Sequence, residues 1–176
     1  MKNAVFIDRD GTIVLDTGYV HKAEDFELLP NVIEGLSKLR KFMLFIVTNQ
    51  SGIGRGVYKL EDFEKFNGRM INELGKHKIK IEKIYYCPHS PEDNCDCRKP
   101  KTKFLKDAKK KFNVDMKKSF VIGDQKADIE LGKNGGCTTV LVLTGNGNKT
   151  KNEIKADFVA KDLLGAAKWI IKNDKK

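Results

Sequence analysis

The chain has 176 residues, of which 40% are hydrophobic and 33% charged, and these values fit one folded domain and exclude a disordered or fibrous chain. No apolar run approaches the roughly 20 residues that a membrane-spanning helix needs, and the N-terminus leads into a strand-like segment without a signal peptide. We therefore expect a cytoplasmic protein with no membrane partner.

The formal net charge is +10, and most of it comes from lysine, which gathers at residues 109–111, 117–118 and 175–176. A basic chain can bind nucleic acid or attract small anions. These clusters lack interleaved aromatic residues, and no nucleic-acid-binding motif is present. We interpret the lysines as solvated faces of helices and loops, and we do not expect nucleic acid as the partner.

Apolar runs typical of buried strands alternate with segments of helical periodicity. The predicted elements, in chain order, are strand 4–7, helix 32–39, strand 44–47, helix 60–74, strand 81–86, helix 103–112, strand 119–122, helix 127–133, strand 138–143 and helix 163–171. Thr102 and Asp162 are the expected N-caps of the third and fifth helices, and residues 145–155 are expected to form a loop. The alternation predicts a single α/β domain over residues 1–176, a Rossmann-like three-layer sandwich with a central parallel sheet.

Polar side chains follow four of the predicted strands. Asp8 and Asp10 come directly after the first strand, and Gly11 permits the chain to turn there. Thr48 ends the second strand, Cys87 ends the third, and Asp124 follows the fourth. Each signal is weak alone, because paired aspartates are common in loops. Since active sites of open α/β sheets lie beyond the carboxyl ends of the strands, the repetition predicts one site at that edge.

Four short motifs follow one another along the chain: the acid pair Asp8 and Asp10, the hydroxyl of Thr48, the lysine Lys99 and the acid Asp124. This ordered set resembles the four motifs of the haloacid dehalogenase superfamily of phosphohydrolases. The resemblance implies an Mg²⁺-dependent phosphatase in which Asp8 forms an aspartyl-phosphate and Asp10 transfers protons. Thr48 and Lys99 would contact the phosphoryl oxygens. The ion offsets the repulsion between a carboxylate and a phosphate, and the resemblance assigns it to Asp8, the backbone carbonyl of Asp10, and Asp124.

Asp128 follows Asp124 by four residues, and its role is left open by the sequence. It is expected to orient Lys99, to hold a metal-bound water, or to cap the helix that follows.

Three cysteines and one histidine lie within residues 87–97, as Cys87, His89, Cys95 and Cys97. Three thiolates and one imidazole complete a tetrahedral zinc site with no open position, so the pattern predicts a structural zinc loop. A metal-free reduced loop is the alternative, and the absence of a Cys-x-x-Cys pair argues against a redox role. Cys137 stands apart and is expected to be a small buried residue.

The stretches DRDGTI, TNQSGIGRG, CPH…CDCRKP and GDQKADI resemble one branch of that superfamily, the heptose 1,7-bisphosphate and histidinol-phosphate phosphatases. Two stretches favour the heptose enzymes: residues 16–21 followed by 24–26, and residues 49–56. The resemblance implies hydrolysis of the 7-phosphate of D-glycero-D-manno-heptose 1,7-bisphosphate, a step towards heptose precursors of lipopolysaccharide or S-layer glycans. Gln125 departs from the basic residue often found at its position in those enzymes, so the sequence leaves open the substrate contact made at that position.

The interval between Asp10 and Thr48 is too short for a large cap domain, so loops must enclose the substrate. The resemblance assigns the substrate site to Asp16, Tyr19, Asn49, Gln50, Ser51, Arg98 and Lys99. Arg98 is expected to recognise the second phosphate, because a guanidinium matches phosphate oxygens in geometry. Arg55 is either a further contact or a residue of a surface loop.

The alternatives are a histidinol-phosphate phosphatase, a nucleic-acid 3′-phosphatase on the same frame, and a basic zinc module that binds nucleic acid. We expect a monomer whose partner is a small phosphorylated metabolite and whose cofactors are Mg²⁺ and Zn²⁺.

Overall fold

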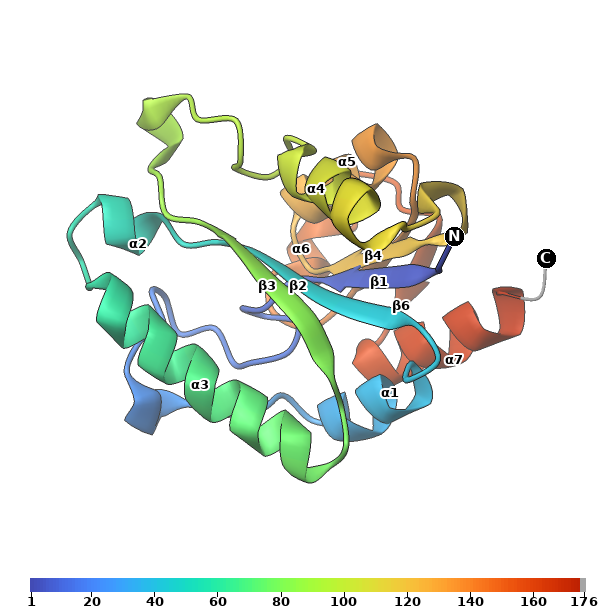
Figure 1. Ribbon diagram of the computed structural model, residues 1–176, viewed down its shortest axis with the longest axis horizontal. Coiled ribbons are helices and arrows are strands. Elements are labelled where there is room, and N and C mark those ends of the chain that lie inside the picture. Colours follow the sequence, from blue (N-terminus) through green and yellow to red (C-terminus); the bar gives the residue numbers. More distant parts are fainter. Residues whose placement is uncertain (175–176) are drawn as a thin grey trace.

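The computed structural model describes residues 1–174, so the lysine pair 175–176 lies outside the described residues. Six parallel strands form one sheet (Figure 1), in the order β3-β2-β1-β4-β5-β6. The strands are β1 (Ala4–Ile7), β2 (Met43–Asn49), β3 (Ile81–Cys87), β4 (Phe120–Gly123), β5 (Thr138–Val142) and β6 (Phe158–Ala160).

Helices cover both faces of the sheet, as the alternating pattern predicted. The helices are α1 (Val32–Lys38), α2 (Ser51–Gly54), α3 (Leu60–Lys76), α4 (Lys103–Phe112), α5 (Lys126–Gly135), α6 (Gly147–Thr150) and α7 (Leu163–Asn173). Side chains of α1, α3 and α7 share one apolar cluster with the sheet, and those of α4 and α5 share clusters on the other face. The fold is therefore the expected three-layer α/β sandwich.

Alternate side chains of each central strand enter different layers. In β1, Val5 and Ile7 join the cluster under α1, α3 and α7, whereas Ala4 and Phe6 join the cluster under α4. All four side chains are fully buried. Burial on both faces explains why these strands read as continuous apolar runs rather than as an alternation of apolar and polar residues.

The carboxyl ends of β1 and β4 form the switch point of the sheet. The chain leaves β1 towards β2 and β3 on one side and continues from β4 towards β5 and β6 on the other. Neighbouring loops diverge at such a point and leave a crevice that commonly binds a ligand. The connection from β1 to β2 holds only a 3₁₀ turn (Ala23–Asp25) and α1. This agrees with the prediction that no large cap domain is inserted there.

Two local predictions were wrong, and two short elements were not predicted. Residues 145–155 contain the short helix α6, and the sequence did not predict the four-residue helix α2 or the three-residue strand β6. Thr102 does not cap α4: its φ and ψ are −92° and 13°, and its side chain makes no capping hydrogen bond. Asp162 does cap α7, since its side chain accepts a hydrogen bond from the Gly165 amide at 2.8 Å. Within residues 1–174, no helix is both long and apolar enough to cross a membrane.

Candidate active site

Lys99 joins two carboxylates at the bottom of the crevice. Its Nζ donates hydrogen bonds to Asp8 Oδ1 at 2.6 Å, to Asp128 Oδ1 at 2.7 Å and to the Val47 carbonyl at 2.9 Å. Asp8 follows β1, and Lys99 lies between β3 and α4. All three charged side chains are at least 93% buried, so the pairs are shielded from solvent.

This buried cluster has an excess of negative charge, because it contains more carboxylates than ammonium groups. Burial raises the pKa of Asp8 well above its usual value; Lys99 opposes the shift, and the neighbouring aspartates add to it. Burial and then the Asp128 charge raise the pKa of Asp124 to about 6. Burial alone would lower the pKa of Lys99, but Asp128 and Asp8 outweigh it and raise that pKa above its ordinary value. Lys99 therefore stays charged, and one ammonium is surrounded by three carboxylates.

The donor set fits a hard divalent cation. Carboxylate oxygens of Asp8, Asp124 and Asp128 lie within 4.8 Å of one another. Oδ2 of Asp124 accepts a hydrogen bond from the Asn146 amide at 2.7 Å, whereas its buried Oδ1 has no hydrogen-bond partner. Because an unsatisfied buried oxygen is costly, this atom is a natural ligand for an ion that prefers oxygen, such as Mg²⁺.

Asp128 is less available to an ion than its two neighbours. Its Oδ1 accepts from Lys99, and its Oδ2 accepts from the Gln125 amide at 3.0 Å at the start of α5. Two of the three roles left open by the sequence, orienting Lys99 and capping the helix, thus correspond to contacts that are present.

A pocket of 290 Å³ opens above these groups. It is lined by every residue that the sequence assigned to substrate binding, together with the acid pair and Thr48: Asp8, Asp10, Asp16, Tyr19, Thr48, Asn49, Gln50, Ser51, Arg98 and Lys99. Val20, Gly18, Tyr58 and Gln125 also contribute. Arg55 is absent from this lining; it forms an exposed ion pair with Glu92 at 3.1 Å, which fits the surface-loop alternative.

Comparison with known proteins gives the family. A model described as HAD-hydrolase-like matches residues 96–166. The chain is 45% identical to the D-glycero-alpha-D-manno-heptose-1,7-bisphosphate 7-phosphatase of Campylobacter jejuni over 85% of each chain. It is 42% identical to the D-glycero-beta-D-manno-heptose-1,7-bisphosphate 7-phosphatase of Photorhabdus laumondii, over 95% of this chain and 94% of the relative. The chain belongs to the heptose bisphosphate phosphatase family of haloacid dehalogenase-like hydrolases.

The fold agrees with this family. The solved D,D-heptose 1,7-bisphosphate phosphatase from B. bronchiseptica, a complex with magnesium and phosphate, superimposes with a TM-score of 0.91. The two proteins share 28% sequence identity, and the match covers 97% of this chain and 98% of the other. As a member of this family the chain is a phosphoric monoester hydrolase. Its predicted catalytic aspartates stand at the switch point of the sheet.

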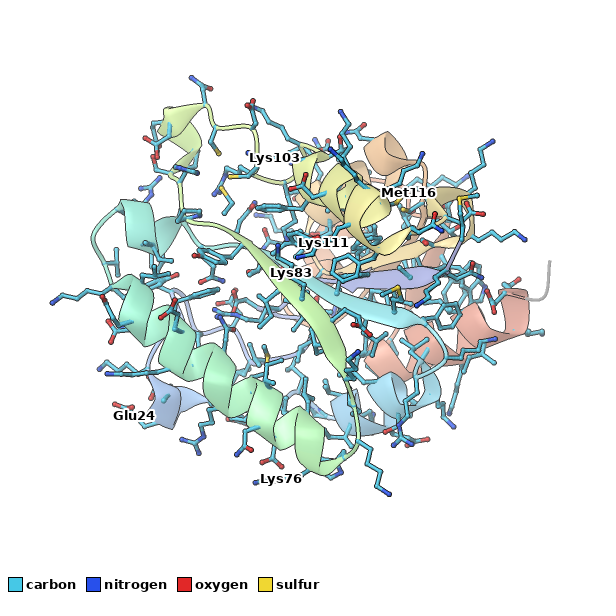
Figure 2. The ribbon with its side chains drawn as sticks, viewed as in Figure 1. Glu24, Lys76, Lys83, Lys103, Lys111 and Met116 are labelled. Atoms are coloured by element: carbon cyan, nitrogen blue, oxygen red, sulfur yellow. The ribbon has the colours of Figure 1, made fainter. Side chains whose placement is uncertain are left out.

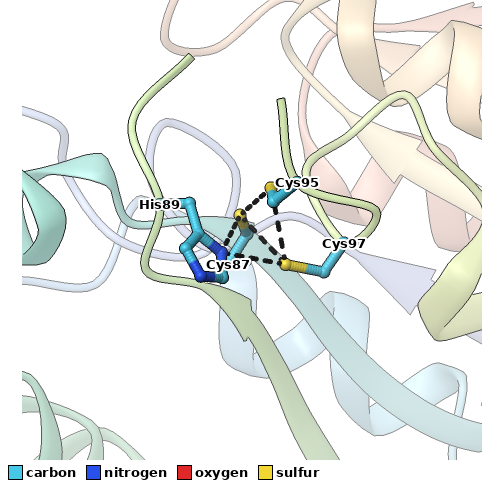
Figure 3. A group of neighbouring side chains, drawn as sticks. All are labelled: Cys87, His89, Cys95 and Cys97. Carbon is cyan, nitrogen blue, oxygen red and sulfur yellow. Dashed lines mark hydrogen bonds between the residues drawn. The ribbon is translucent and has the colours of Figure 1, made fainter. Parts of the chain in front are cut away.

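The cysteine–histidine group converges as its Cys-x-His and Cys-x-Cys pattern predicted (Figure 3). The Sγ atoms of Cys87, Cys95 and Cys97 lie 3.3–3.7 Å apart, and Nδ1 of His89 lies 3.3 Å from the Cys97 sulfur. Zinc–sulfur bonds of about 2.3 Å in a tetrahedron place sulfurs about 3.8 Å apart, so this spacing is close to that of a zinc site. Burial would raise the pKa of Cys95, but hydrogen bonds from Cys87 and from the backbone of Cys97 and Arg98 lower it to about 7.

The loop that carries this group leads directly into the cationic residues of the pocket. Arg98 donates to the His89 carbonyl at 3.3 Å. The Lys99 amide donates to Asn49 Oδ1 at 3.0 Å, and Asn49 Nδ2 donates to the Lys99 carbonyl at 3.4 Å. The side chain of Asn49 therefore holds the backbone of Lys99 in place as well as lining the pocket.

Two parts of the site were missed by reasoning from the sequence. The first is the segment at Gly145 and Asn146, which packs on Asp124. A Cβ at Gly145 would lie 2.3 Å from Asp124 Oδ2, and its φ of 51° favours glycine. Nothing in a single sequence links this polar loop to Asp124. The second part is Arg9, whose only signal was its place between the two aspartates.

Proposed function

We propose that the chain is an Mg²⁺-dependent phosphatase that removes the 7-phosphate of D-glycero-D-manno-heptose 1,7-bisphosphate through an aspartyl-phosphate on Asp8. The observation that carries this proposal is the cluster at the switch point, where Asp8 and Lys99 line one pocket and carboxylate oxygens of Asp124 and Asp128 lie within 4.8 Å of those of Asp8. The names of the relatives support the sugar bisphosphate as substrate.

Each residue of the cluster has a distinct part in the proposed reaction. A carboxylate oxygen of Asp8 attacks phosphorus, and the bond from phosphorus to the sugar oxygen breaks. Asp10 gives a proton to the departing sugar oxygen and then takes one from the water that hydrolyses the aspartyl-phosphate. The ammonium of Lys99 and the hydroxyl of Thr48 stabilise the charge on the phosphoryl oxygens.

The metals belong to the same proposal. Asp8, the backbone carbonyl of Asp10, and Asp124 would hold Mg²⁺, which reduces the repulsion between the Asp8 carboxylate and the phosphate. The unpartnered Oδ1 of Asp124 supports this ligand set. Cys87, His89, Cys95 and Cys97 would hold a structural zinc ion in the loop 87–97 of a single phosphatase domain over residues 1–176.

The substrate site is proposed at the mouth of the pocket. Asp16, Tyr19, Asn49, Ser51 and Arg98 line it and would contact the sugar and its second phosphate. Gln50 also lines the pocket, but its amide is occupied by protein groups. The names of the relatives include both the alpha and the beta anomer of the substrate, so both must be tested.

We propose a cytoplasmic monomer that supplies heptose precursors for lipopolysaccharide or S-layer glycans. Four free cysteines suit a reducing compartment.

The test measures phosphate release by the wild type and by Asp8→Asn with Mg²⁺ and the two anomers of heptose 1,7-bisphosphate. Histidinol phosphate and a 3′-phosphorylated oligonucleotide serve as competing substrates. We expect the wild type to prefer a heptose bisphosphate, and Asp8→Asn to lose at least about 1,000-fold in kcat while its circular dichroism is unchanged. Full activity in the variant would refute the nucleophile. A preference for histidinol phosphate or the oligonucleotide would refute the substrate.

A further inference from the structure

Arg9 is a buried arginine between the two aspartates of the pocket. Its side chain is fully buried, and its guanidinium lies over the rings of Phe63 and Phe66 on α3, at 5.4 and 4.7 Å from their centroids. Nη1 donates to Asn67 Oδ1 at 3.3 Å, and Nη2 donates to the Val20 carbonyl at 3.0 Å. The guanidinium is therefore fixed by groups from several segments of the chain.

The same guanidinium donates two hydrogen bonds to the carboxylate of Asp10. Nε donates to Asp10 Oδ1 at 2.8 Å, and Nη2 donates to Asp10 Oδ2 at 3.1 Å. The exposed fraction of the side chain is 1% for Arg9 and 17% for Asp10, so the pair lies at the boundary between the core and the pocket. Two donors on two oxygens fix both the place and the plane of the carboxylate.

Gln50 donates a further hydrogen bond to the Asp10 carboxylate. Its Nε2 donates to Asp10 Oδ2 and to Thr48 Oγ1, both at 2.7 Å. Its Oε1 accepts from Arg9 Nη2 at 3.2 Å and from the Tyr58 hydroxyl at 2.5 Å. All four hydrogen-bonding positions of the amide are used within the protein. Because Arg9 and Tyr58 both donate to Oε1, the oxygen and nitrogen of the Gln50 amide cannot exchange places.

The contacts of this network are concentrated on one of the two aspartates. The side-chain hydrogen bonds of Arg9 and Gln50 reach Asp10 and Thr48, whereas the side chain of Asp8 is held by Lys99 from another segment. A buried guanidinium could in principle serve the fold alone, since it needs a counter-ion wherever it lies. Here its counter-ion is the residue assigned to proton transfer, so the network also sets the direction of that carboxylate.

We propose that Arg9, Gln50 and Tyr58 are positioning residues that hold the Asp10 carboxylate for proton transfer. The inference rests on the proposed function, in which Asp10 is the acid and base. It also changes the expected role of Gln50 from a substrate contact to a support of Asp10. Loss of the Arg9 contacts, which reach Asp10 but not Thr48, should slow the steps that need a proton from Asp10 or to Asp10, and should leave the attack of Asp8 itself intact.

A substrate with a good leaving group separates these steps. In the first half-reaction with p-nitrophenyl phosphate, the bond from Asp8 to phosphorus forms and p-nitrophenolate leaves with the electron pair, so no proton is required. In the second half-reaction water attacks phosphorus, its proton passes to Asp10, and the Asp8 carboxylate is released. A sugar phosphate needs the Asp10 proton in the first half-reaction as well.

The experiment compares the first-turnover and steady-state rates of p-nitrophenolate release for the wild type and Arg9→Lys, with Mg²⁺ present. We expect the first-turnover rate constant to stay within about 3-fold of the wild type and the steady-state rate to fall at least about 10-fold. With a sugar phosphate the first turnover should fall too. Equal losses in both phases, or wild-type rates in both, would overturn the proposal.

Three further variants make the result decisive. Asn67→Leu removes one hydrogen-bond acceptor of Arg9 without removing the buried charge. It should give the same pattern, with a loss of about 3- to 10-fold in the steady-state rate. If Arg9→Lys does not fold, wild-type rates in a folded Asn67→Leu would count against the network. Arg69→Lys is the matched control, since Arg69 is an arginine of α3 that contacts the exposed Ala23 carbonyl, and its rates should not change.

Asp10→Asn distinguishes the inference from the function on which it rests. If Asp10→Asn separates the two phases and Arg9→Lys does not, Asp10 keeps its role and the positioning network is refuted. If Asp10→Asn turns over at the wild-type rate, the proposed role of Asp10 fails first.

Discussion

Asp8, Asp124 and Asp128 surround a single ammonium group, that of Lys99, and this imbalance of charge dominates the chemistry of individual residues in the pocket. Asp128 is already satisfied by Lys99 and the Gln125 amide. The unsatisfied charge therefore resides on Asp8 and Asp124, whose carboxyl groups have raised pKa values for the same first reason, burial. A proton or a metal ion can relieve this charge, so the two should compete.

That competition predicts how pH changes the stabilisation by Mg²⁺. In the metal-free protein the pKa of Asp124 is raised from 3.8 to about 6, so protonation stabilises the folded state and this stabilisation is lost as pH rises through about 6. Mg²⁺ requires the deprotonated carboxylate. The increase in Tm caused by Mg²⁺ should therefore be small near pH 5 and reach its full size above about pH 7.

Differential scanning fluorimetry with Mg²⁺ or EDTA across this pH range measures the increment. Asp124→Asn is the control, because it removes the titrating ligand and should abolish the increment at every pH. An increment of the same size at both ends of the range would contradict the assignment of Asp124 as a ligand.

At the scale of elements, the strands could be predicted because β1, β2, β4 and β5 are buried on both faces and read as unbroken apolar runs. β6 could not be, because it is a three-residue edge strand whose Val159 is 43% exposed. Thr102 has the residue type of an N-cap but not the extended backbone that a cap requires. Local residue preference fixes such details less firmly than the packing of the whole sheet does.

The convergence of the site could be predicted because its residues follow the strands of a parallel sheet. Asp8, Thr48 and Asp124 stand at strand ends, and parallel strands bring their carboxyl ends to one edge. The environment of Arg9 could not be predicted, because Asn67 and the two phenylalanines that hold it lie about 60 residues further along the chain, on α3. Contacts of that separation exist only after α3 has packed on the sheet.

The end of β3 and the loop that follows it contain the four residues of the proposed zinc site. Cys87, His89, Cys95 and Cys97 lie in the segment that leads into Arg98 and Lys99, and Arg98 donates to the His89 carbonyl. If zinc binds this group as proposed, loss of the ion should displace both cations. Cys95→Ser should reduce the zinc content from about one ion per chain to nearly none and lower kcat/KM by about 10-fold or more. Cys137→Ala is the matched control, since Cys137 lies apart from the group and contacts Met116.

Zinc content is measured by inductively coupled plasma mass spectrometry and activity under saturating Mg²⁺. Wild-type kcat/KM in a zinc-free Cys95→Ser protein would show that the loop holds Lys99 without the ion. Loss of zinc from Cys137→Ala would show that the metal is not bound by the group in Figure 3.

At the scale of the whole molecule, the formal net charge is +10, and among the described residues Lys99 is the one lysine in the pocket lining. Lys76 lies near the end of α3 and Lys103 at the start of α4, far apart on the surface (Figure 2). The pocket lining itself holds three carboxylates, Asp8, Asp10 and Asp16, against two cations, Arg98 and Lys99. Long-range attraction of an anionic substrate must therefore come from the rest of the chain and from the proposed Mg²⁺.

This distribution predicts a dependence on salt that grows with the charge of the substrate. Each phosphate monoester carries roughly −1.5 to −2 at pH 7, so a bisphosphate carries about twice the charge of a monophosphate. Raising the ionic strength from about 0.01 M to 0.15 M shortens the Debye length from about 30 Å to 8 Å. We expect kcat/KM for heptose 1,7-bisphosphate to fall about 3- to 10-fold, and that for p-nitrophenyl phosphate to fall much less, while kcat at saturation changes less than about 2-fold. Equal losses for the two substrates would mean that the lysines of the outer surface do not attract the substrate, and that recognition depends on contacts within the pocket.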